Sequence, residues 1–107
     1  MDREERIAHN EILFREVNER IEKLQAGEGS EGRFDFLCEC GEKECIAAVS
    51  LTLAEYEALR SDPTQFVVVP GHTDPSIEQA VQSGERYTIV RKKGEAAEVA
   101  ERHDPRS

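Results

Sequence analysis

The first quarter of the chain has the hydrophobic periodicity of a helix. Across residues 2–25, apolar side chains and one asparagine fall on the a and d positions of a heptad repeat, and charged residues fill the other faces. These positions are Ile7, Asn10, Phe14, Val17, Ile21 and Leu24. Such a seam must be buried somewhere. We therefore expect the helix either to pack on its own domain or to pair, through residues 7–24, with a second copy or a partner protein.

A glycine-rich segment follows the helix. Residues 27–32 contain no large apolar side chain, and their composition is typical of a flexible linker. The sequence thus divides into a helical segment (1–26), this linker, a compact unit (33–103) and a frayed tail (104–107). Because the linker is flexible, the helix is free to dock on the compact unit or to reach another chain.

The first half of the compact unit predicts two strands and a helix. Residues 33–37 have a strand pattern, and residues 46–51 form a returning strand after a cysteine-rich loop. Thr52 and Glu55 have the spacing of a capping box, which marks the start of a helix. The buried stripe of that helix is Leu53, Tyr56 and Leu59.

The second half predicts two more strands and two short helices. Residues 65–69 are apolar on both faces, which is typical of a central strand. Asp74 and Pro75 have the character of the N-cap and first residue of a short helix that carries Ile77, Ala80 and Val81. A strand over 87–91 and an Ala-rich helix over 95–102 follow. The sequence therefore predicts an α+β fold with a small, mostly antiparallel sheet of about four strands.

The charge of the chain excludes one class of partner. With 14 basic and 23 acidic side chains, the formal net charge is −9, and phosphate backbones repel such a surface. The single basic run, 91–93, ends a predicted strand and is interpreted as a solvated strand end. We therefore expect no nucleic-acid partner.

The hydropathy and the N-terminus predict a cytoplasmic location. No window approaches the ~20 apolar residues that span a bilayer, so we expect no membrane partner. The first residues are charged and lack the apolar segment of a secretory signal. Thiols stay reduced in the cytoplasm, and three cysteines within eight residues fit a metal site better than a disulfide framework.

The cysteines have the pattern Cys-x-Cys-x4-Cys, at positions 38, 40 and 45. Zinc prefers four soft ligands in a tetrahedron, and closely spaced cysteines on a turn bring three of them together. His72 is the preferred fourth ligand, because the Pro-Gly break before it would hold its imidazole in place. His103 in the tail and His9 on the first helix are the alternatives. The sequence thus predicts one zinc site formed by Cys38, Cys40, Cys45 and His72.

Other roles for the cysteines fit less well. Inert core cysteines would not sit beside three glutamates, a redox pair normally has Cys-x-x-Cys spacing, and nothing singles out one cysteine as a nucleophile. A catalytic zinc would need an open coordination position, whereas four good ligands close the site. A nearby carboxylate of Glu39, Glu42 or Glu44 could serve as a base, but the His-x-Glu deaminase pattern is absent. We therefore expect no catalytic residues.

Three segments carry a resemblance to known sequences: FREVNERI (14–21), FLCECGEKEC (36–45) and LTLAEYEALRSDPTQFVVVPGH (51–72). On these, the chain resembles a family of short, uncharacterised bacterial proteins, largely actinobacterial, which share its CxCx4C…PGH pattern and a similar tail. The resemblance implies the same grouping of Cys38, Cys40, Cys45 and His72 and implies no activity. The cysteine spacing alone is also similar to the zinc-binding tail of protein lysine methyltransferases, whose catalytic domain this chain lacks.

The function that these patterns favour is a zinc-stabilised protein-interaction module of a regulatory or adaptor kind. A closed metal site, an acidic surface and a heptad helix on a tether all point to it. The alternative is a metalloenzyme, or a thiol or metal sensor, that uses the same Cys/His cluster.

Overall fold

A computed structural model describes residues 3–26, 32–42 and 44–106, so the predicted linker lies almost wholly outside the described residues. Three helices and five strands follow one another as α1 (Arg3–Ala26), β1 (Arg33–Leu37), β2 (Ala48–Thr52), α2 (Leu53–Leu59), β3 (Gln65–Val68), β4 (Glu78–Ser83), β5 (Thr88–Lys92) and α3 (Gly94–Arg102). Among these described helices, none has the length and apolar character needed to cross a bilayer. The α+β prediction is confirmed.

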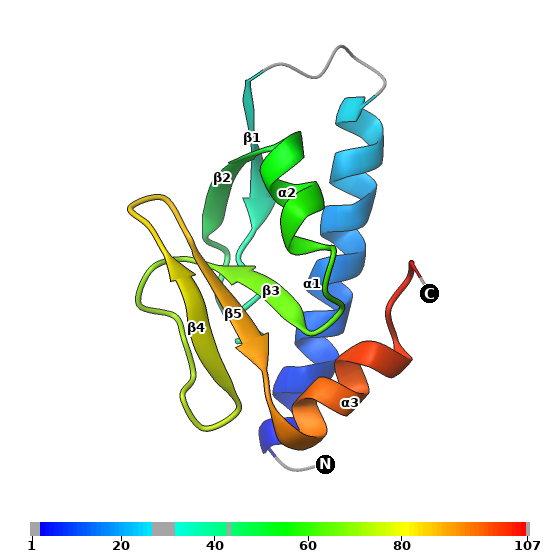
Figure 1. Ribbon diagram of the computed structural model, residues 1–107, viewed down its shortest axis with the longest axis vertical. Coiled ribbons are helices and arrows are strands. Elements are labelled where there is room, and N and C mark those ends of the chain that lie inside the picture. Colours follow the sequence, from blue (N-terminus) through cyan, green and yellow to red (C-terminus); the bar gives the residue numbers. More distant parts are fainter. Residues whose placement is uncertain (1–2, 27–31, 43, 107) are drawn as a thin grey trace.

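The strands form two small antiparallel sheets rather than one. β1 pairs with β2, and the second sheet has the order β3-β5-β4 (Figure 1). The two sheets meet where the chain leaves β1, because the backbone N–H of Glu39 donates to the carbonyl of Val67 at 2.8 Å. The long helix α1 runs beside both sheets, and α3 crosses its first turns (Figure 1).

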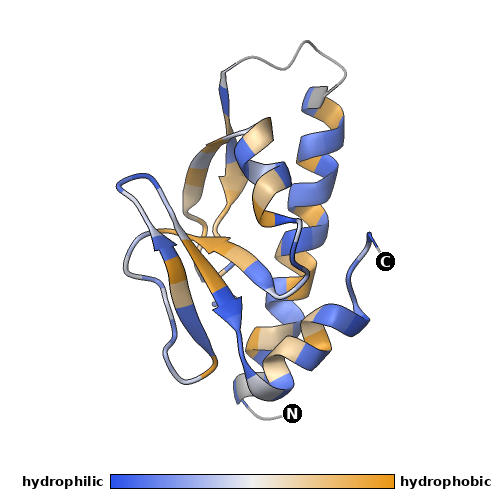
Figure 2. Cartoon of the chain, viewed as in Figure 1, coloured by the Kyte–Doolittle hydropathy of each residue, from blue (hydrophilic) through white to orange (hydrophobic). Residues whose placement is uncertain are grey.

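The strand predicted to be central, β3, lies at the edge of its sheet. Its apolar character has another cause, since both of its faces are covered. Val67 belongs to a first core with residues of β1, β2 and α2, whereas Phe66 and Val68 belong to a second core with Val90 and the cysteines. The strand is hydrophobic over most of its length (Figure 2) because it serves both cores.

The helix predicted over 74–81 is wrong, because this segment forms β4. Asp74 does accept a hydrogen bond from the N–H of Ser76, as an N-cap would, but it closes only one turn. From Glu78 onward the backbone pairs with β5 instead, with a register shift between Ala80 and Gln82. Pairing with a distant strand thus overrides the local helix signal.

The helix predicted from the capping box is confirmed. The hydroxyl of Thr52 accepts from the N–H of Glu55 at 3.0 Å, and the Glu55 carboxylate accepts from the N–H of Thr52 at 2.8 Å. The resulting helix, α2, buries its predicted stripe in the first core, where Tyr56 stacks on Phe36 with ring centroids 4.7 Å apart.

The first helix packs on its own chain, but not through a simple apolar seam. Ile7 and Ile12 are buried, whereas Val17 and Leu24 of the predicted seam are 40% and 73% exposed. Hydrophilic residues recur along the whole helix (Figure 2). Several of them face the protein interior, namely Glu11, Arg15, Asn18 and Glu19. The buried face of α1 is therefore largely polar.

Asn18 shows how a polar face can be buried at little cost. Its side-chain amide accepts from the N–H of Leu37 at 2.8 Å and donates to the carbonyl of the same residue at 3.0 Å. It also donates to the carboxylate of Glu39 at 2.8 Å. The amide therefore occupies the place of a neighbouring strand at the end of β1, and it leaves these buried groups paired.

Ion pairs hold the second half of α1 and the end of the chain. Glu19 accepts from Arg60 at 2.6 Å and from Arg106 at 2.8 Å, and Asp104 pairs with Arg60. The segment predicted to be a frayed tail is thus bound to the body of the protein through Asp104 and Arg106. The prediction of fraying missed this because the partners lie far away in the sequence.

We expect Asn18→Ala to lower the free energy of unfolding by about 3 kcal/mol. The substitution removes the hydrogen bonds of Asn18 to the backbone N–H and carbonyl of Leu37 and its hydrogen bond to the Glu39 carboxylate. Urea denaturation of the variant measures this. The exposed neighbour Arg20→Ala is the control and should change stability by less than about 0.5 kcal/mol. Equal effects of the two substitutions would contradict the role given to Asn18.

Candidate metal centre

Two loops bring the four predicted ligands together. Cys38, Cys40 and Cys45 lie on the loop between β1 and β2, which we call the cysteine loop, and His72 lies on the loop between β3 and β4, the histidine loop. One ligand atom from each residue lies within 4.8 Å of the others. Among the described residues, this is the one group of His, Cys, Asp or Glu side chains arranged to hold a metal ion.

The histidine loop is positioned by a tight turn directly after β3. The N–H of His72 donates to the carbonyl of Val69 at 2.9 Å, with Pro70 and Gly71 between them. Gly71 has a φ of 93°, a conformation that favours glycine. Proline followed by a positive-φ glycine is the pattern of a type II turn. The predicted Pro-Gly bend therefore fixes the backbone position from which the His72 side chain extends.

The cysteine loop is closed by its own backbone. The N–H of Cys38 donates to the carbonyl of Ala47, and the N–H of Cys45 donates to the carbonyl of Glu42, both at 3.0 Å. The first bond extends the β1–β2 pairing as far as the first cysteine. The second forms a turn that returns the third cysteine toward the first two.

Two distances within the cluster match those of a tetrahedral zinc site. The imidazole Nδ1 of His72 lies 3.5 Å from the Sγ atom of Cys38 and 3.7 Å from that of Cys45. Zinc at its usual distances from sulfur and nitrogen would set such atoms about 3.6 Å apart. These two distances are those expected around one ion, and all four donor atoms lie within 4.8 Å of one another, so the structure supports the predicted grouping. The cluster could hold a metal ion; its identity stays a prediction.

Burial divides the cluster into two halves. Cys38 and Cys40 are 1% and 7% exposed and belong to the second core. Cys45 is half-buried and His72 is exposed. A hollow of about 440 Å³ opens beside this outer half and is lined by both of these residues, together with Cys40, Arg3 and Asp74 among others. Among the described residues, the cluster is thus open to solvent on the side of Cys45 and His72.

The electrostatics of the cysteine pair favour a bound cation. A hydrogen bond from Cys38 lowers the pKa of the Cys40 thiol to about 4, and the same bond together with burial raises the pKa of Cys38. The backbone N–H of Val69 donates to the Sγ of Cys38 at 3.2 Å, which favours its thiolate. The lowered pKa of Cys40 and the donor from Val69 both favour a thiolate, which is the form of cysteine that binds a metal.

The glutamate between the first two cysteines is not a base at the metal. Glu39 is fully buried, and its carboxylate accepts from the N–H of Val67 at 3.0 Å and from Asn18. Burial raises its pKa to about 7, against these N–H donors and the nearby charges of Arg15 and Arg60, which lower it. Its role is to join the cysteine loop to β3 and α1. The sequence did not indicate this role, because a glutamate beside a cysteine ligand has no pattern that predicts its burial.

The exposed position predicted for Lys92 is wrong. The run 91–93 was expected to be a solvated strand end, yet Lys92 is 3% exposed. Its ammonium pairs with the buried carboxylates of Glu11 and Glu78. Two acidic partners on other elements compensate its burial, and neither is adjacent in the sequence.

The alternative ligands, His9 and His103, are exposed and lie outside the Cys/His cluster.

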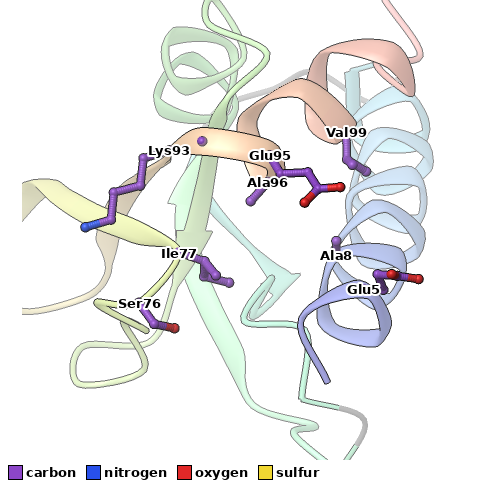
Figure 3. A pocket seen from close by; sticks show the side chains of 9 residues that line it. Glu5, Ala8, Ser76, Ile77, Lys93, Glu95, Ala96 and Val99 are labelled. Atoms are coloured by element: carbon purple, nitrogen blue, oxygen red, sulfur yellow. The ribbon is translucent and has the colours of Figure 1, made fainter. Parts of the chain in front are cut away.

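Another hollow, of about 380 Å³, lies between the first turns of α1 and α3. Ala8, Ile77, Ala96 and Val99 supply apolar side chains to it, and Glu5 and Glu95 bring carboxylates to its side (Figure 3). It shares no lining residue with the hollow beside the Cys/His cluster. The two hollows are therefore separate features.

Comparison with known proteins adds no identity. No protein-family model, curated protein or solved structure matches this chain. The resemblance to short bacterial proteins accordingly stays a prediction.

We expect His72→Ala to weaken metal binding by more than about a hundredfold. Loss of a residue that only supports a ligand already costs about 10- to 100-fold, so loss of a ligand should exceed this. Competition with a chelator of known affinity measures the change. His9→Ala and His103→Ala are matched controls that should retain native stoichiometry and affinity. A large effect of His103→Ala would assign the fourth ligand to the tail.

Proposed function

We propose that the protein is a zinc-stabilised protein-interaction module of a regulatory or adaptor kind. The observation that carries this proposal is the convergence of three cysteine sulfur atoms and one imidazole within 4.8 Å, from two loops that are far apart in the sequence. Three sulfur donors and one nitrogen form a closed tetrahedral set that is typical of structural zinc.

The position of the cluster supports a structural role for the ion. Cys38 and Cys40 line the second core beside Phe66, Val68 and Val90. This core is small, and a chain of 107 residues buries a modest share of its surface. A metal that ties the cysteine loop to the histidine loop would close this side of the core. Binding free energy would then contribute directly to folding.

We expect elemental analysis of the purified protein to find one zinc ion per chain. Removal of that ion by a chelator, or Cys40→Ser, should lower the melting temperature by more than about 10 °C, because a structural zinc contributes several kcal/mol to folding. Differential scanning fluorimetry with metal analysis of the same sample checks both. An unchanged melt after verified metal removal would refute the structural role.

The exposed face of α1 is the proposed interaction surface. A homodimer through the whole seam of residues 7–24 would have to use Ile7, which is buried on its own chain. The available apolar surface is the outer face of the helix, which we define as Leu13, Val17 and Leu24; they are 56%, 40% and 73% exposed. Spaced four and seven residues apart along the helix, they lie on one face and suit a second helix from another copy or a partner.

We expect the intact protein to dimerise through this face, and Leu13→Asp combined with Val17→Asp to abolish the dimer. Light scattering at several concentrations measures the mass. Val81→Asp is the matched control, because Val81 is 38% exposed on β4, close to the 40% of Val17, and this variant should remain dimeric. A monomeric intact protein would leave a partner's helix as the occupant, and a dimer unaffected by the double substitution would rule out this face.

One observation favours the second candidate function, a metalloenzyme or a thiol or metal sensor. The outer half of the cluster, Cys45 and His72, borders the hollow of about 440 Å³. A ligand could approach the metal there if one protein ligand were displaced. Cobalt substitution separates the two functions: a spectrum that azide or cyanide leaves unchanged supports the closed site, and a shifted spectrum supports an open one.

A further inference from the structure

We infer that the first three turns of α1 form part of the metal centre, and that metal binding and docking of this helix are coupled. The inference rests on the proposed metal binding and adds a positioning role to residues that supply no ligand. Neither the heptad pattern nor the cysteine motif indicates it. It follows from contacts that α1 makes with both ligand-bearing loops.

The contact with the cysteine loop centres on Gly41, the residue after Cys40. The side chain of Asn10 donates to the carbonyl of Gly41 at 2.8 Å. A Cβ atom at position 41 would lie 2.6 Å from Ile7 Cγ2 and 2.8 Å from Glu11 Cγ, so only glycine allows this approach. Gly41 also has a φ of 81°, which favours glycine. The helix therefore clamps the loop next to a metal ligand.

The contact with the histidine loop runs through buried charges. Glu11, which packs on Gly41, also pairs with Lys92, and Lys92 pairs with Glu78. The second carboxylate oxygen of Glu78 accepts from the backbone N–H of Asp74 at 2.8 Å, two residues beyond His72. One chain of polar contacts thus connects the helix to the second loop. Because Glu11, Lys92 and Glu78 are buried, removal of Lys92 would leave two carboxylates without their cation, and removal of Glu78 would leave the N–H of Asp74 without its acceptor.

A surface contact spans the two loops directly. The guanidinium of Arg3 lies 3.3 Å from the carboxylate of Glu42 on the cysteine loop and 3.4 Å from that of Asp74 on the histidine loop. Its side chain is 59% exposed, so each pair contributes little on its own. Arg3 nevertheless connects α1 to both loops, and it lines the hollow beside Cys45 and His72.

These contacts imply a reciprocal coupling. The helix is held at its first turns by loops in the arrangement that brings the four donors together. If docked α1 favours that arrangement, it raises metal affinity, and by linkage a bound metal must favour docking by the same factor. Metal occupancy would thereby control whether the buried face of α1, with Asn10 and Glu11, stays on its own domain.

The test compares the rate of metal transfer to excess chelator from folded, zinc-loaded variants. Asn10→Ala removes the bond to Gly41 and should speed transfer about three- to tenfold, the range set by one neutral hydrogen bond. His9→Ala is the matched control, one residue away and exposed, and should transfer metal at the native rate. Arg3→Ala should lie between them. The cobalt form of Asn10→Ala should also show an altered ligand-field spectrum, which a remote loss of stability would not produce.

The outcomes separate this inference from the proposed function. A native protein that binds no metal refutes the proposed function itself. A native protein that binds metal tightly, with Asn10→Ala and Arg3→Ala both matching His9→Ala in rate and spectrum, refutes only the role of α1. If Asn10→Ala does not fold, Arg3→Ala decides alone, because its exposed side chain can be removed without disturbing the core.

Discussion

Glu39 is buried where the two sheets and the first helix meet, and its carboxylate connects all three. It accepts a hydrogen bond from Val67 on β3 and another from Asn18 on α1, while its own backbone pairs with Val67. A buried carboxylate is costly unless such donors surround it. The arrangement of these donors therefore constrains the rest of the structure. It holds β3 against the end of β1, and it fixes the residue between the first two cysteines.

The Cys/His cluster depends on this constraint. Cys38 and Cys40 flank Glu39, so their backbone positions are set on the inner side by a polar network. His72 is set from β3 by the turn that begins at Val69, whose N–H also reaches Cys38. Both ligand-bearing loops thus depart from the same point of contact between β1 and β3. This explains how short loops with few apolar residues can present four donors in one small volume.

Buried polar contacts, rather than an apolar seam, also account for the docking of α1. Arg15 is fully buried, donates to the carbonyls of Pro63 and Ala100, and stacks on the ring of Phe66 at 4.6 Å. Such contacts are directional, and they specify one placement of a helix more narrowly than apolar packing does. The apolar residues Leu13, Val17 and Leu24 are consequently left exposed on the outer face of α1.

Features whose signals are local could be predicted from the amino-acid sequence. The capping box at Thr52, the Pro-Gly turn before His72 and the cysteine spacing each involve neighbours within a few residues, and each has the predicted form. Features that depend on distant partners became clear from the folded chain alone. Lys92 can be buried because the carboxylate of Glu11, 81 residues away in the sequence, pairs with its ammonium group. Residues 78–83 form a strand because β5 supplies hydrogen bonds that a local helix signal could not outweigh.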